Sequence, residues 1–189
     1  MRFNAYLDDV EALTKYLSKT IGDFMNFFNT NKPKELFSLN ELIVEMKSII
    51  NKRLKSIHLE VNMEDNILLE GYRSELLQVL LIIINNAIDA CLSESEDRNF
   101  KIKLDIEESK EYLKIRVFNN GGNIPQVILD KIFDPYFTTK HQSKGTGLGL
   151  YILKMIVEQR MLGEVKIDNF KEGIVVELNI PWSKRILED

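Results

Sequence analysis

The chain lacks most of the features that stabilise or localise proteins outside the cytoplasm. Its 189 residues include a single cysteine, which excludes an internal disulfide and a thiolate-rich metal site. No apolar run approaches the roughly 18 residues of a membrane span, and we see no signal-peptide pattern. The net charge of −4 mixes both signs, so it gives no reason to expect nucleic acid or an anionic membrane as a partner. We therefore expect a cytoplasmic protein.

What the chain does have is an ordinary globular composition, with 44% hydrophobic and 29% charged residues. Its length suggests one domain and an appendage. Residues 5–29 read as an amphipathic helix with a narrow apolar stripe of the coiled-coil or bundle type. Because nothing nearby in the sequence could cover this stripe, we expect it to pair with another helix, and a polar linker to follow over residues 29–36. The stripe consists of Val10, Leu13, Leu17, Ile21, Phe24 and Phe28.

The remaining pattern predicts a two-layer α/β (α+β) sandwich, in which helices cover one face of a mixed, mostly antiparallel sheet. A Ser-Leu-Asn-Glu capping box opens a helix near residue 39. The run from Val79 to Ile84 could be strand or helix by periodicity, but its length and polar continuation favour a buried helix. We expect helices at 39–55, 74–92, 126–132 and 147–162, and strands at 57–62, 67–69, 101–107, 112–118, 164–169 and 173–180.

The most informative motif is Ile-Phe-Asp-Pro-Tyr-Phe-Thr-Thr-Lys at residues 132–140, followed by Gly-Thr-Gly-Leu-Gly-Leu at residues 145–150. An aromatic anchor is joined to a polar loop and then to a glycine turn that opens a helix. Glycines let backbone N–H groups approach phosphate oxygens, and a helix start adds the positive end of its dipole. We therefore predict a movable lid that closes over a nucleotide. Phe133 and Phe137 are expected to anchor this lid in the core rather than to stack on adenine.

Two further stretches complete the pattern, Asn85-Asn86-Ala87 on the buried helix and Asn-Asn-Gly-Gly-Asn-Ile-Pro at residues 119–125. In order and spacing, these stretches and the lid resemble the ATP-binding domain of sensor histidine kinases, within the wider GHKL ATPase group. The resemblance covers roughly residues 36–183. It implies a catalytic ATP-binding domain at residues 34–189. It also implies that residues 1–33 are the second helix of a truncated dimerisation and phosphoacceptor bundle with its linker.

The resemblance implies ATP and Mg²⁺ as cofactors and assigns roles to individual residues. Asn86 would be the metal ligand, since Mg²⁺ bound to a triphosphate needs only one or two protein ligands. Lys140 would neutralise phosphate charge during transfer and, with Asn86, carry the catalytic role. The nucleotide-binding residues would be Asn86, Asn119, Gly121, Asn123, Ile124, Phe133, Phe137, Thr138, Lys140, Gly145, Thr146, Gly147, Leu148, Gly149 and Leu150.

Three positions depart from the family pattern. Asn119 stands where the family has an Asp that accepts a hydrogen bond from the adenine amino group. Loss of the charge costs on the order of 1 kcal/mol, or roughly fivefold in affinity. Because an amide can also donate, we expect relaxed discrimination against guanine. Asn123 replaces a glycine, and Ile82 replaces an Asn one turn before Asn86. We expect a thinner phosphate site, unless Ile82 simply packs.

The chain has two histidines, and neither fits the family's phosphoacceptor. His58 lies on a predicted strand and His141 in the lid. The resemblance therefore implies that the γ-phosphoryl of ATP goes to a histidine outside this chain. Its partners would be that histidine, a response regulator, and a second copy joined through the N-terminal helix. No nucleic-acid partner is expected.

Two alternatives stay open from the sequence. The first is a GHKL ATPase of the topoisomerase, mismatch-repair or chaperone type, but those typically carry a catalytic Glu just ahead of the Mg-binding Asn. Residues 82–84 are all Ile here. The second is a catalytically weak or inert nucleotide-binding module, a pseudokinase, which the substitutions at Ile82, Asn119 and Asn123 keep open.

Overall fold

A computed structural model describes residues 33–54, 57–64, 67–93, 99–109, 111–140 and 146–182. The helix expected at residues 5–29 and its apolar stripe lie outside these residues. The division into a bundle helix and a catalytic domain therefore stays a prediction. All of the described residues except Pro33 belong to residues 34–189, the range expected for the catalytic domain.

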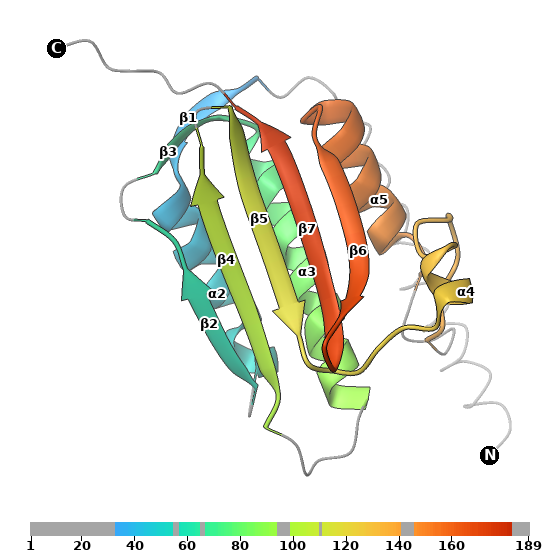
Figure 1. The fold of residues 1–189 in the computed structure, drawn as a ribbon. Coiled ribbons are helices and arrows are strands. Elements are labelled where there is room, and N and C mark those ends of the chain that lie inside the picture. Colours follow the sequence, from blue (N-terminus) through green and yellow to red (C-terminus); the bar gives the residue numbers. More distant parts are fainter. Residues whose placement is uncertain are drawn as a thin grey trace, which may run out of the picture.

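The sheet has five strands in the order β2-β4-β5-β7-β6 (Figure 1). Strand β2 (His58–Asn62) runs parallel to β4 (Lys101–Glu108). The remaining pairs are antiparallel and join β4, β5 (Tyr112–Asn119), β7 (Gly173–Pro181) and β6 (Glu164–Phe170). The mixed, mostly antiparallel sheet predicted from the sequence is thereby confirmed.

Three helical elements cover one face of this sheet (Figure 1). They are α2 (Leu39–Leu54), α3 (Arg73–Ser93) and α5 (Gly149–Met155), which continues into the π-helical turn η1 (Ile156–Arg160). The short helix α4 (Gln126–Leu129) lies beyond the β6 edge of the sheet (Figure 1). Alternate strand residues and the apolar sides of the helices form one core, which includes Leu42, Met46, Leu80, Ile84, Ile88, Ile102, Leu104, Ile115, Leu153 and Leu178.

Helix α3 is the central helix of this core, as its near-continuous apolar run predicts. Contrary to the expectation that no apolar run approaches a membrane span, this helix could cross a membrane by length and composition, with a mean hydropathy of 1.8 over an 18-residue window. Its apolar side chains are instead used inside the domain, where Val79, Leu80, Ile83, Ile84 and Ile88 are almost fully buried. Burial against a sheet and two helices is the ordinary use of such a helix in a folded domain.

One prediction from the sequence was wrong. The polar linker expected up to residue 36 gives way to a strand, β1 (Glu35–Ser38), which pairs antiparallel with β3 (Leu68–Gly71). The partner strand is distant in sequence, and only Phe37 of the four β1 residues is buried. Because the strand is defined by this distant partner, no local hydrophobic periodicity in the sequence indicates it. The capping residue was correct, since the Glu41 N–H donates to Ser38 Oγ at 3.4 Å.

Candidate nucleotide site

Helix α3 carries a small polar group just after its apolar run. Asn86 and Asp89 are one turn apart, so they share one side of the helix. The ammonium of Lys140 reaches both of them, at 3.1 Å from Asn86 Oδ1 and 2.7 Å from Asp89 Oδ2. The two residues predicted to be catalytic, 54 positions apart in sequence, therefore contact each other directly. Asp89 was not among the predicted site residues, although its spacing from Asn86 is the signal that could have identified it.

A second cation closes the group from the side of helix α2. Arg53 Nη2 lies 2.5 Å from Asp89 Oδ1, and its other nitrogen donates to Asn85 Oδ1. Asn85 and Asn86 therefore serve different partners, as expected for neighbours that point about 100° apart on a helix. The Asp89 carboxylate is shared between cations from α2 and from the lid.

The loop that follows β5 is fitted closely against α3. Asn119, at the end of β5, is only 4% exposed, and its Oδ1 accepts a hydrogen bond from the Gly121 N–H at 3.1 Å. A Cβ added at Gly121 would lie 2.7 Å from the Ala90 carbonyl carbon and from the Cys91 nitrogen. Only glycine fits there, because the loop backbone touches the helix backbone. The side-chain oxygen predicted to face adenine is thus already engaged within its own turn.

The rest of this loop is tied to the hairpin between β6 and β7. The Ile124 N–H donates to Asn169 Oδ1, and Asn169 Nδ2 donates back to the Ile124 carbonyl, both at 2.8 Å. Asn123 Nδ2 donates to the Lys171 carbonyl at 3.3 Å. The hairpin turns against the loop so tightly that a Cβ at Gly173 would lie 1.8 Å from the Asn119 carbonyl oxygen. Sequence reasoning missed Asn169, which no motif marks.

The two described sides of the lid meet at one backbone contact. A Cβ at Gly147, whose φ is +66°, would lie 2.4 Å from the carbonyl carbon of Tyr136, which itself has a φ of +65°. Each of the two segments also has a local hydrogen bond, from the Lys140 N–H to Thr138 Oγ1 at 3.1 Å and from the Leu148 N–H to Thr146 Oγ1 at 3.2 Å. Gly145 lies outside the described residues.

The aromatic and apolar lid residues divide in their environment. Phe133 is half-buried against the core, with Lys154 Nζ 5.2 Å from its ring centre, in agreement with an anchoring side chain. Phe137 is half-buried, and Leu148 is buried. Ile82 packs against the core beside the start of α5, where its Cγ2 lies 3.6 Å from a Cβ built on Gly149. The side chain that replaces the family's Asn is therefore used in packing.

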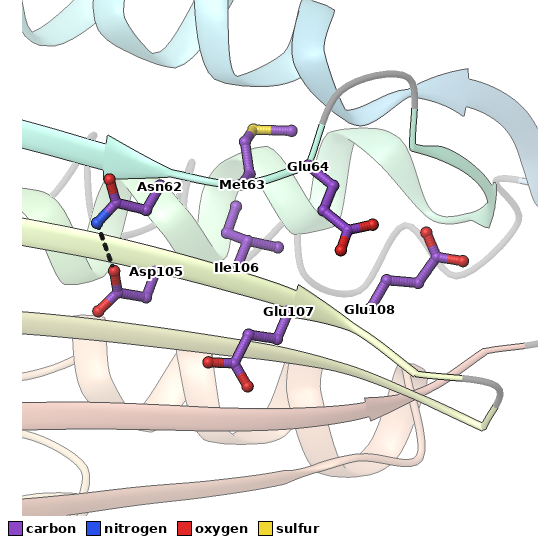
Figure 2. Close-up of a pocket in the computed structure, with 7 residues that line it drawn as sticks. All are labelled: Asn62, Met63, Glu64, Asp105, Ile106, Glu107 and Glu108. Atoms are coloured by element: carbon purple, nitrogen blue, oxygen red, sulfur yellow. Dashed lines mark hydrogen bonds between the residues drawn. The ribbon is translucent and has the colours of Figure 1, made fainter.

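Two shallow cavities open on the sheet. One, of about 440 Å³, lies at the sheet edge beyond β2, and Figure 2 shows its acidic lining, including Glu64 and Glu107. The other, of about 330 Å³, is lined by two phenylalanines and by four cations, Lys101, Lys103, Arg116 and Lys171. None of the lining residues belongs to the predicted site. Three of the four cations are each matched by a carboxylate nearby, in Lys101–Glu60, Lys103–Asp105 and Arg116–Glu177.

In two of these pairs, Lys101–Glu60 and Lys103–Asp105, the cation lowers the pKa of the carboxyl group. The Lys101 ammonium and the Asn62 amide, both hydrogen-bonded to Glu60, lower the pKa of that carboxyl to about 2. Burial opposes ionisation of Asp105, but hydrogen bonds from Lys103 and Asn62 outweigh it and lower its pKa. On α3, burial raises the pKa of Cys91 to about 11, which makes this thiol inert at neutral pH.

Comparison with known proteins identifies the family to which the chain belongs. A family model described as histidine kinase-, DNA gyrase B- and HSP90-like ATPase matches residues 71–184, more than half of the chain. The two-component sensor PprA of Pseudomonas aeruginosa is 34% identical over 113 residues, which are 59% of this chain and 12% of that protein. Sporulation kinase A of Bacillus subtilis is 30% identical over 155 residues, 80% of this chain and 24% of that protein. The chain thus spans about a quarter or less of these curated relatives.

Solved structures of histidine kinases also match the chain. The catalytic domain of histidine kinase ThkA has a TM-score of 0.71 and 33% identity, over 80% of this chain and 97% of that one. A structure of ThkA in complex with the response regulator protein TrrA matches 90% of this chain and 49% of that one, with a TM-score of 0.68 and 28% identity. The histidine kinase AdeS of Acinetobacter baumannii, at 21% identity and a TM-score of 0.72, covers 96% of this chain and 84% of that one and shares the fold.

Proposed function

We propose, because the chain belongs to the histidine kinase-, DNA gyrase B- and HSP90-like ATPase family, that it binds ATP and transfers the γ-phosphoryl to a histidine outside this chain. The observation that carries the proposal is the meeting of Lys140 with Asn86 and Asp89. A lid cation, an amide oxygen and a carboxylate come together beside a glycine-rich helix start. That is the donor set needed around a metal-bound triphosphate.

The residues present fit a magnesium ion. Asn86 Oδ1 and Asp89 Oδ2 already bind one cationic group, the Lys140 ammonium. Mg²⁺ is held in nucleotide sites by one or two protein oxygens, with phosphate and water supplying the rest. Asn86 would hold the ion, and a bound ion would neutralise charge on the phosphates. Lys140 would then be released toward the phosphate oxygens, where its charge stabilises the transfer.

Adenine would be recognised at Asn119 and Gly121, because the Asn119 Oδ1 that accepts from the Gly121 N–H has a second lone pair. Asn119 is buried at the end of β5, on the loop that touches α3. Its position matches the place where the family has an Asp, and the neutral amide supports weaker binding and less discrimination between ATP and GTP. Asn123, Ile124, Phe133 and Phe137 would shape the walls. Thr138 and the turn formed by Thr146, Gly147, Leu148, Gly149 and Leu150, together with Gly145, would border the phosphates.

In this mechanism the domain contributes positioning and charge stabilisation. Phosphoryl transfer is an in-line displacement whose charge spreads over the phosphate oxygens, so little covalent chemistry is asked of the protein. Asn86 and Lys140 would fix the phosphates, and the glycine turn would bring backbone N–H groups to them. The attacking imidazole and any base that activates it would come from the segment, outside this chain, that carries the acceptor histidine.

The partners are part of the same proposal. The acceptor histidine would belong to the same full-length kinase, and the helix at residues 5–29 would join two copies as a homodimer. A response regulator would receive the phosphoryl group, and the solved complex of ThkA with TrrA supports this choice. The location would be cytoplasmic, because ATP is available there. Attachment of the full-length parent to a membrane is compatible with this location.

The departures at Ile82, Asn119 and Asn123 favour one competing function, a nucleotide-binding module that transfers no phosphate. The test is to mix the chain, Mg²⁺ and γ-labelled ATP with a family bundle that carries the acceptor histidine. We expect acid-labile, base-stable label on the bundle. Nucleotide binding without label would support the inert module, and absence of binding at millimolar ATP would contradict both.

A further inference from the structure

We propose that Asp89 is a positioning residue that holds the Lys140 ammonium at the Asn86 amide, and that Arg53 fixes Asp89 for this task. The inference extends the proposed function, since it concerns how the same site is set before nucleotide arrives. Four side chains from α2, α3 and the lid form one connected group, with the Asp89 carboxylate at its centre.

The charge balance explains why a carboxylate is needed at this point. Arg53 and Lys140 each bring a positive charge to one side of α3, at 2.5 and 2.7 Å from the two Asp89 oxygens. Without Asp89, the two cations would face each other with no anion between them. All three side chains are about a third or more exposed, so water weakens each pair. Sharing one carboxylate between two cations fixes its orientation through both oxygens.

The geometry also assigns an order of events at Asn86. Its Oδ1 accepts a hydrogen bond from Lys140 Nζ, so it cannot bind a metal ion through the same direction at the same time. Lys140 must therefore leave Asn86 when a metal-bound nucleotide enters. It can do so while staying on Asp89, the shorter of its two contacts. Asp89 is then the fixed point about which the lysine turns from the amide toward phosphate.

The first test needs no nucleotide and reads the anchoring directly. The Lys140 backbone N–H, bonded to Thr138 Oγ1, reports on this part of the lid through its amide exchange rate. We expect Asp89→Asn, which keeps size and polarity, to speed this exchange by about three- to fivefold. Arg53→Gln should have a smaller effect. The matched control Asp168→Asn, on the exposed strand β6, should have none.

The pairing itself is tested by combining variants. If Asp89 acts through Lys140, then Lys140→Gln should reproduce the faster exchange, and adding Asp89→Asn to it should change nothing further. Additive effects, or an unchanged rate in Asp89→Asn, would overturn the proposal. Because no ATP is present, this result stands or falls independently of whether the chain transfers phosphate.

The second test measures phosphoryl transfer from ATP to an added family bundle that carries the acceptor histidine. A cation aimed by Asp89 acts on the transferring phosphate, so Asp89→Asn should lower kcat about tenfold while KM for ATP changes less than about threefold. A merely structural carboxylate would lower the melting temperature and leave both constants of the folded fraction unchanged. A rise in KM with constant kcat would also contradict the inference, because it would place Asp89 in substrate binding.

Discussion

Helix α3 and the open face of the sheet pair the same types of charged side chain in different ways. On the sheet, each cation lies next to a carboxylate on a neighbouring strand or on its own, as in Lys103 with Asp105 and Arg116 with Glu177. At α3, one carboxylate serves two cations from elements far apart in sequence. The sheet pairs stabilise strands that are already adjacent. The α3 group instead connects segments whose relative position matters for chemistry.

The largest effect should come from filling the contact between the loop that follows β5 and helix α3. Gly121→Ala places a methyl group 2.7 Å from helix backbone atoms that cannot move aside. We expect it to lower the free energy of unfolding by about 2–3 kcal/mol. Urea denaturation measures this. Gly71→Ala, whose new methyl would meet only the Phe37 ring at 3.9 Å, is the matched control and should be near neutral; equal losses would show that the contact is not special.

A smaller effect should result from placing a carboxylate at position 119, where we propose that adenine is recognised. Asn119→Asp should tighten ATP by roughly fivefold, since a charged acceptor binds the adenine amino group more strongly. GTP should not gain, because its corresponding group is an acceptor. Competition between the two nucleotides measures the ratio. An ATP preference of about a thousandfold or more in the unaltered chain would contradict the expected loss of discrimination.

The smallest effect concerns the sheet pairs and appears only in acid. The pKa of Glu60 is lowered from its ordinary 4.5 to about 2, so its ionised form stabilises the folded state. This contribution is complete above pH 4.5 and is lost as the pH falls through about 2. Glu60→Gln should flatten the pH dependence of the melting temperature in that window and leave ATP binding at neutral pH unchanged. A change in ATP binding would mean that the open face of the sheet is coupled to the site.

The sequence predicted the elements well because most of them are set by local pattern. The buried run of α3 and the alternating strands β4 and β5 match the expected ranges closely. Strand β1 was missed because its partner lies outside any local window. The contacts around the candidate site were predicted in the same uneven way. Asn86 and Lys140 belong to recognisable motifs, whereas Arg53 and Asn169 reach the site through tertiary packing that no motif encodes.

The central claim is that the polar group on α3 is a magnesium–nucleotide site, and calorimetric titration of Mg-ATP tests it most directly. Asn86→Ala should weaken binding by about 10- to 100-fold and leave the melting temperature nearly unchanged, since Asn86 is only half-buried. The matched control Asn62→Ala removes an amide hydrogen-bonded to Asp105 on the open face and should bind as the unaltered chain does. Equal affinity in Asn86→Ala and Asn62→Ala would contradict the claim.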